Sequence, residues 1–508
     1  MDIKTVSNWH DGSFCLLRNG KVEKHVIAER VNHIKHSQIC DESSSYFDEN
    51  LTDAIFSRVE SSHHIFHAAH SFYDSGFNKA VCVIIDGMGS HVKINTPHFK
   101  KGTYGRESIS VYLFEYPNKF TELYKEIVVP FDCNLYYKDL NVKITSNISP
   151  GLMFQKTCES IEMKWYDAGK LMSMASYGEN NIDIEDSFFI GSDLRDFKLN
   201  YKLDTFQDKC DFAKSLQLKC QERVKNIILD SIEKSKCKNI CMSGGYFLNC
   251  VSNTFVQRNL PKDVRTFIEP ICGDDGISIG LAKLNWYEKT RSKKKIPLKN
   301  IYFGKPQVID IEGEKVTPKK VAHLLADKKV IGIFQSRSES GPRSLGNRSL
   351  LYDPRDPNGR DKINKVKGRE NYRPLSATVL QEHAHEWFDM CGMKESPYML
   401  YTFDVLSDKV PAITHVDNTC RVQTLKKSFN KHYYDLIHEF YKITNIPMIM
   451  NTSLNLAGDT IVETIDDVLF TLHNSEIDYI YFPETSVLVS KDTLNTITGS
   501  TAILRRRV

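Results

Sequence analysis

Two histidines and a carboxylate that follows an apolar run are the residues in this chain whose types and spacing best suit chemistry. His63 and His67 lie four positions apart, so a helix here would place both imidazoles on one face. The run from Ala80 to Ile85 predicts a buried strand that ends directly before Asp86. Two histidines with one carboxylate form a facial ligand set for a divalent metal. Such a histidine pair alone is more often a packing or capping feature, and Asp86 makes metal binding the favoured interpretation.

A second carboxylate could complete this metal site. Asp274 lies in the sequence Gly-Asp-Asp-Gly, where we expect it to end a strand. His64 lies between the two candidate ligands and His70 follows them, and we expect both to be neighbours that pack against or support the site.

Glycine turns supply two further candidate sites. The sequence Ser243-Gly244-Gly245 follows a short apolar run and precedes a predicted helix, an arrangement that points backbone N–H groups at a phosphate or ribose. The turn from His10 to Ser13 could present backbone N–H groups to an anion. Turns of this composition are usually only turns. Asp167 and Lys170 could lie at one pocket edge or form a surface ion pair, and both interpretations stay open.

The segment from Gln335 to Pro374 holds ten basic residues against five acidic ones. Guanidinium groups bind phosphate oxygens two at a time, so this composition suits phosphate recognition. An extended RNA surface is the competing interpretation. The segment has little aromatic interleaving for base stacking, which favours a small polyphosphate pocket.

Length and composition limit the remaining choices. A chain of 508 residues is too long for one ordinary core, so we expect two or three domains. The charged, proline-terminated stretch around Arg291 to Pro297 predicts a linker at 291–300 between domains 1–290 and 301–508. A net charge of +3 gives no global argument for binding a membrane or polymeric nucleic acid. No run approaches 18 apolar residues, so we expect a cytoplasmic protein, with a homodimer as an open option.

Long patterns along nearly the whole chain resemble the O-carbamoyltransferase family that includes the nodulation-factor, cephamycin and tobramycin carbamoyltransferases. They occur in the family's order, and include H-D-G-S, E-R-V-N-H-I-K-H, H-H-I-F-H-A, I-D-G-M-G, D-A-G-K-L-M, S-G-G-Y-F-L-N-C, G-D-D-G, E-S-G-P-R-S-L-G-N-R-S, K-G-R-E-N-Y-R-P, H-V-D-N-T-C-R-V-Q-T and M-N-T-S-L-N.

The resemblance implies α/β and α+β architecture in two domains. The N-terminal domain would be Kae1-like, of the actin and Hsp70 fold class, and the C-terminal domain YrdC-like. The YrdC-like domain would make carbamoyl adenylate from carbamoyl phosphate and ATP with Mg²⁺. The Kae1-like domain would transfer the carbamoyl group to a hydroxyl of a small-molecule acceptor: a sugar, a natural product or a hydroxymethylated pyrimidine nucleotide.

The resemblance also implies roles for individual residues. The metal ligands would be His63, His67, Asp86 and Asp274, with Fe²⁺ the expected ion. His10 would be the general base for the acceptor hydroxyl, while Lys35 and Asp167 would position the carbamoyl adenylate. Its nucleoside would be bound by Gly244, Gly245 and Asn249. ATP and carbamoyl phosphate would be bound by Arg343, Lys367, Arg373, Arg421, Asn451 and Ser453.

The chain departs from the family patterns at three places. The family's D-E-G-K has Ala168 in its second position, its A-A-S-A-F reads Ala-Ala-His70-Ser-Phe, and its E-F-G-P-R has Ser340 in place of phenylalanine. The first two put the shape of the acceptor side in question and remove no proposed ligand.

Three other functions compete with this interpretation. A tRNA threonylcarbamoyladenosine synthase would pair the same domain types, but the C-terminal patterns fit users of carbamoyl phosphate better. The hydrogenase-maturation carbamoyltransferase would need cysteine-paired zinc modules, and the sequence has no C-x-x-C pair. A nucleotide-dependent actin-like scaffold would need neither the four candidate metal ligands nor His10.

Overall fold

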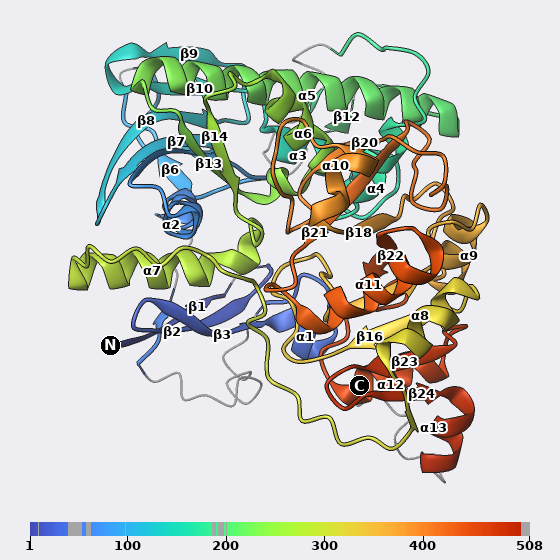
Figure 1. Cartoon of the computed structure of the whole chain (residues 1–508). Coiled ribbons are helices and arrows are strands. Elements are labelled where there is room, and N and C mark those ends of the chain that lie inside the picture. The colour runs from blue at the N-terminus through green and yellow to red at the C-terminus, as the bar shows by residue number, and fades with distance from the viewer. Residues whose placement is uncertain are drawn as a thin grey trace. The chain divides into compact units, whose positions relative to one another are not determined.

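The structure is a computed structural model that describes residues 1–8, 10–38, 53–56, 62–96, 98–184, 189–190, 198–199 and 201–498. It forms two compact units (Figure 1). The first unit comprises Met1–His25 and Ser37–Lys299, and the second comprises Val26–His36 and Asn300–Val508. The division after Lys299 falls within the stretch expected to be a linker. The short segment Val26–His36, which we expected in the first domain, belongs to the second unit.

The first unit contains two main sheets. Its four-stranded sheet has the order β3 (Lys21–Ile27), β2 (Ser13–Arg18), β1 (Asp2–Ser7) and β4 (Ile55–Phe56). Its eight-stranded sheet has the order β14 (Arg265–Ile268), β13 (Asn239–Ser243), β5 (Lys79–Ile85), β7 (Tyr104–Glu115), β8 (Lys119–Val128), β10 (Val142–Thr145) and β9 (Asn134–Tyr137), with β6 (His91–Lys93) also paired to β7. The strands β11 (Phe189–Ile190) and β12 (Lys198–Leu199) form a separate pair.

The strand β5 lies at the centre of the larger sheet because all but the first of its residues are apolar and buried. It pairs in parallel with β13 and antiparallel with β7. The helix α2 (His63–Ser75) packs against β5, β7 and β13, and also against α7 (Ile277–Thr290) (Figure 1). Gly76 ends α2 with a positive φ of 71°, as expected for a helix C-terminus.

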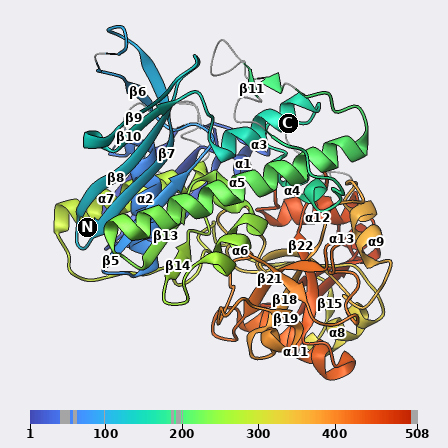
Figure 2. The same cartoon turned by 90° about the horizontal axis from the view of Figure 1, so that it is seen from above.

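The other helices of this unit are α3 (Pro150–Ser160), α4 (Ala168–Ala175), α5 (Phe206–Ser235) and α6 (Cys250–Asn259). The 3₁₀ turns are η2 (Lys138–Leu140), η3 (Gly245–Leu248) and η4 (Asp274–Gly276). The long helix α5, which crosses the view of Figure 2, begins with a reciprocal capping box between Thr205 and Asp208.

The second unit is built on a ten-stranded mixed sheet. Its order is β15 (Glu314–Lys315), β24 (Val487–Ser490), β23 (Tyr479–Phe482), β16 (Ile331–Phe334), β17 (Arg348–Tyr352), β22 (Met448–Ser453), β18 (Ser376–Leu380), β21 (Thr419–Leu425), β20 (Thr402–Val405) and β19 (Phe388–Asp389). Its helices are α1 (Ala28–Asn32), α8 (Pro318–Ala326), α9 (Gly359–Val366), α10 (Ala384–Trp387), α11 (Lys431–Thr444), α12 (Ile465–His473) and α13 (Lys491–Thr498), with the 3₁₀ turn η5 (Gln381–His383).

Both units therefore mix helices with parallel and antiparallel strands, which confirms the predicted mixture of α and β structure. The finer Kae1-like and YrdC-like assignments stay predictions. Among the described residues, no helix combines the length and apolar character needed to cross a bilayer.

Candidate metal centre and anion site

The four predicted metal ligands lie together in the first unit. Ligand atoms of His63, His67, Asp86 and Asp274 are all within 4.8 Å of one another, and all four residues are buried. The His63 Nε2 atom is 3.0 Å from Asp86 Oδ2 and 3.4 Å from Asp274 Oδ1, and His67 Nε2 is 3.3 Å from the same Asp274 oxygen. Bonds of about 2.1 Å to one ion would separate neighbouring ligand atoms by about 3.0–3.4 Å.

The local folds explain how these four residues converge. His63 and His67 face the same way from successive turns of α2, and Asp86 directly follows β5 as predicted. The prediction that Asp274 ends a strand is wrong, because β14 ends at Ile268 and Asp274 instead begins η4.

The polar atoms of this site are arranged as ligands of a cation. His67 Nε2 and Asp274 Oδ2 are buried without an acceptable hydrogen bond. Burial lowers the pKa of His63, but the carboxylates of Asp274 and Asp86 outweigh it and raise that pKa to about 10. Burial favours the neutral form of Asp274, yet His63 and His10 hold its pKa well below the ordinary value. The donor set and its charge fit a divalent transition metal.

The glycine turn lies directly beside this cluster. Gly244 has a φ of +100°, and a Cβ atom there would lie 2.2 Å from the carbonyl oxygen of Ile85. The turn can therefore approach the end of β5 only with glycine at this position. As a result the Gly245 N–H donates to Asp86 Oδ1 over 3.2 Å.

His10 also reaches the cluster. Its Nε2 atom is 3.1 Å from Asp274 Oδ2, and its ring packs edge-to-face with Trp165 at 5.6 Å between centroids. Asp167, two residues beyond Trp165, is the N-cap residue before α4 and pairs with Lys170 over 3.2 Å. The ion pair that the sequence left open is thus present.

Asn249 has a structural role that the resemblance did not indicate. Its side chain accepts a hydrogen bond from the Ser252 N–H as the cap of α6, and its amide donates to Gln217 over 2.8 Å. Its predicted contact with a nucleoside stays a prediction.

The second unit holds a concentration of cations around Lys367. Its Nζ atom is buried among oxygens of Ser453 and Asn455. Burial, followed by the charges of Arg369, Arg373 and Lys35, lowers the pKa of Lys367 well below its usual range. An anion bound here would relieve this repulsion.

The sheet aligns other predicted anion ligands. The strand β18 lies between β21 and β22, and its register places Ser376 opposite both Arg421 and Asn451. The Arg421 Nε–H donates to Ser376 Oγ over 2.9 Å. Asn451 is fully buried and donates to Thr378 Oγ1 and to the Ser344 carbonyl.

Lys35 and Arg369 both lie near Lys367, which the sequence did not predict. Lys35 was predicted to position the carbamoyl adenylate in the N-terminal domain. It lies instead in the second unit, where its charge contributes to lowering the pKa of Lys367. Arg369 had no assigned role, although it has a buried Nη2 without a hydrogen bond and its pKa falls to about 9 through burial, Arg373 and Arg421. Arg369 lies two residues after Lys367 in the sequence, and this proximity could have indicated that it belongs to the same anion site.

The ten basic residues of the segment 335–374 do not all belong to one anion site. Arg348 is fully buried, donates to the carbonyls of Gln335 and Asn347, and lies over the ring of Phe334. It therefore stabilises the fold.

The turn that bears Arg343 is held by a buried carboxylate. Glu339 Oε1 accepts the Leu345 and Asn347 N–H groups over 2.6 and 2.8 Å. These backbone donors are therefore already occupied, and the role of the Arg343 side chain in binding phosphate stays a prediction.

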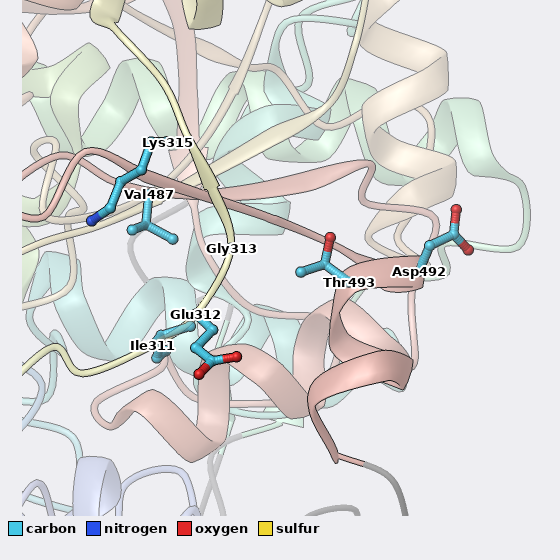
Figure 3. Close-up of a pocket in the computed structure, with 7 residues that line it drawn as sticks. All are labelled: Ile311, Glu312, Gly313, Lys315, Val487, Asp492 and Thr493. Carbon is cyan, nitrogen blue, oxygen red and sulfur yellow. The ribbon is translucent and has the colours of Figure 1, made fainter.

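A pocket in the second unit lies elsewhere, beside β15, β24 and the start of α13 (Figure 3). None of the predicted site residues lines it; the lining residues are Ile311, Glu312, Gly313, Lys315, Val487, Asp492 and Thr493.

Two models of known protein families match this chain. Residues 188–283 match the family model described as carbamoyltransferase N-terminus, and residues 322–490 match carbamoyltransferase C-terminus. The chain belongs to the carbamoyltransferase family. It is accordingly a carbamoyltransferase enzyme, as predicted. The matches cover Gly244, Asp274 and the predicted anion ligands, whereas His10 and the α2 histidines lie outside them.

Similar proteins extend the likeness over most of the chain. Nodulation protein NolNO of Sinorhizobium fredii is 28% identical over 92% of this chain and 77% of its own length. Nodulation protein NolO of Bradyrhizobium diazoefficiens is 28% identical over 82% of this chain and 76% of its own. A crystal structure of full-length HypF, in a phosphate- and nucleotide-bound form, is 11% identical over 57% of this chain and 56% of its own, with a TM-score of 0.35, too low to assign a fold.

Proposed function

We propose that this carbamoyltransferase is an ATP-dependent O-carbamoyltransferase that works in two steps. The observation that carries the proposal is the convergence of His63, His67, Asp86 and Asp274 with His10 inside one unit, while the other unit concentrates cations around Lys367. The first arrangement suits transfer from a phosphate-bearing donor, and the second suits the binding of polyphosphate.

The second unit would form the donor. Water cleaves carbamoyl phosphate to carbamate and phosphate, and a carbamate oxygen attacks the α-phosphorus of Mg²⁺-bound ATP. The bond to the pyrophosphate group breaks, which leaves carbamoyl adenylate and pyrophosphate. Charge from the triphosphate and carbamoyl phosphate would be neutralised by Lys367 with Arg343, Arg373 and Arg421. Ser453 would donate a hydrogen bond, and Asn451, whose amide donates to Thr378 and Ser344, would hold the site in shape.

The first unit would then transfer the carbamoyl group. His10, oriented through its contact with Asp274, takes the proton from the acceptor hydroxyl, whose oxygen attacks the carbamoyl carbon. The bond to the adenylate oxygen breaks and AMP leaves. A divalent ion held by His63, His67, Asp86 and Asp274, Fe²⁺ in our proposal, would supply Lewis-acid stabilisation of the phosphate charge.

The acceptor would be a hydroxyl-bearing small molecule: a sugar, a natural product or a hydroxymethylated pyrimidine nucleotide. The Gly245 N–H donates to Asp86, which holds the glycine turn next to the metal ligands. From this position Gly244 and Gly245 would contact the adenylate. Asp167 would position the same donor. The cytoplasmic location and the homodimer stay predictions.

Pyrophosphate release tests the first step. Purified protein with ATP, Mg²⁺ and carbamoyl phosphate should release pyrophosphate, and omission of carbamoyl phosphate should abolish the release. Release that does not depend on carbamoyl phosphate would contradict the proposed donor chemistry. A mass-spectrometric screen for acceptors that gain a carbamoyl group tests the second step.

A further inference from the structure

A second buried cluster of ionisable groups lies on α2, separate from the predicted metal ligands. His70 Nε2 is 3.2 Å from Asp74 Oδ2 and 3.4 Å from Glu269 Oε1. All three residues are at most 3% exposed. Lys283, from α7, pairs with the other oxygen of Asp74. The transfer mechanism proposed above uses none of these four residues.

The facing atoms of this cluster do not satisfy one another. His70 Nε2 and Asp74 Oδ2 have no acceptable hydrogen bond, although both are buried. The two distances from His70 Nε2 match the separation of about 3.0–3.4 Å expected between ligands of one ion. They also repeat the spacing in the cluster of His63, Asp86 and Asp274. One ligand atom from each of His70, Asp74 and Glu269 lies within 4.8 Å of the other two, so a single ion could contact all three.

The outer contacts support a ligand arrangement. Glu269 Oε1 accepts the Ile271 N–H over 3.2 Å, and Lys283 holds the far oxygen of Asp74. Ligating carboxylates in metal sites are normally oriented by hydrogen bonds of this kind.

The charge of the cluster is compatible with a bound cation. Burial lowers the pKa of His70 to about 4, so its imidazole is neutral near pH 7. Two carboxylates and the Lys283 ammonium then leave one negative charge, and an uncompensated buried charge is costly. A proton on Glu269 would cancel it, and burial and Asp74 do raise the Glu269 pKa well above its ordinary value. A divalent ion would displace that proton, because a carboxylate must be ionised to act as a metal ligand.

We propose that His70, Asp74 and Glu269 bind a second divalent metal ion, of the class that accepts one imidazole and two carboxylates, such as Mn²⁺, Fe²⁺ or Zn²⁺. His70 stands where the family pattern A-A-S-A-F has serine, so the resemblance does not supply this site. The second ion would fix α2, which bears His63 and His67, to the chain that follows β14 and leads to Asp274.

Counting bound ions tests the proposal. The full chain is equilibrated by dialysis with Mn²⁺ alone, and bound metal is measured by mass spectrometry. We expect two ions per chain for the wild type and one for H70S or H67A. H432A, which replaces an exposed histidine of the second unit, should keep two. Circular dichroism checks the fold of each variant, and E269Q, nearly isosteric with the wild type, should also bind only one ion.

The possible counts have distinct meanings. One ion in the wild type that persists in H70S and E269Q would overturn the proposal and support a buried proton on Glu269, which E269Q mimics. Two ions in both the wild type and H70S would also overturn it. One ion in the wild type that H70S removes and H67A does not would support the second site and contradict the first.

Discussion

Replacing Gly244 by alanine would test whether the close approach of the glycine turn to β5 holds Asp86 in place. An alanine Cβ would lie 2.2 Å from the Ile85 carbonyl oxygen, whereas real Cβ atoms essentially never come closer than 3.0 Å, so the chains must separate by about 0.8 Å. The positive φ costs an L-residue about 1–2 kcal/mol, and overpacking adds about 1–3 kcal/mol. We therefore expect G244A to lose about 2–5 kcal/mol of unfolding free energy.

A matched control separates strain from crowding. Gly102 lies in the same unit with a φ of +94° and no atom within 4 Å of a Cβ placed there. G102A should thus lose only the 1–2 kcal/mol of backbone strain. Urea unfolding measured by circular dichroism compares the two variants. Because the Gly245 N–H supports Asp86, G244A should also weaken Mn²⁺ binding about tenfold. Equal stability loss in both variants, with metal affinity unchanged, would refute the argument.

Three further predictions concern other side chains. H10N should retain pyrophosphate release but lose transfer by about 10²–10⁴-fold, since a general base contributes that much; equal loss of both steps would remove His10 from its role. K367M should lose pyrophosphate release through weaker ATP binding, while the exposed control K362M should keep it. Burial opposes ionisation of Glu107, but His64 and Lys125 lower its pKa from 4.5 to about 2. Its contribution of about 3 kcal/mol, present above pH 4.5, should vanish as the pH falls toward 2, and acid titration of E107Q should lack this loss.

Local patterns in the sequence predicted much of the metal cluster. The four-residue spacing of His63 and His67 placed both on one face of α2, and the apolar run before Asp86 identified β5. Asp274 could not be placed by the same reasoning, because five residues separate it from β14 and only the tertiary fold returns it to the histidines. The sequence offered Asp274 only as a carboxylate that could complete the site, and the family resemblance then assigned it as a ligand.

Buried charges in the second unit were harder to interpret. The count of basic residues between Gln335 and Pro374 included Arg348 and Arg369 alike as candidates for phosphate recognition. The structure buries Arg348 against backbone carbonyls and leaves a buried Arg369 Nη2 without a hydrogen bond. Composition cannot distinguish an arginine that stabilises the fold from one that can bind a ligand. The difference depends on whether strands distant in the sequence supply hydrogen-bond acceptors to the guanidinium group.

The membership of Val26–His36 in the second unit has a consequence for how the protein is made. The Arg30 Nη2–H donates to the carbonyl of Gly341, which lies 311 residues later in the chain. His33 lies 3.3 Å from Asp467, later still. A ribosome that adds about 5–20 residues per second needs roughly 15–60 s to reach Gly341 after it has made Arg30. During synthesis, this early segment must therefore remain without its partners while most of the first unit folds, and the second unit closes only near the end of translation.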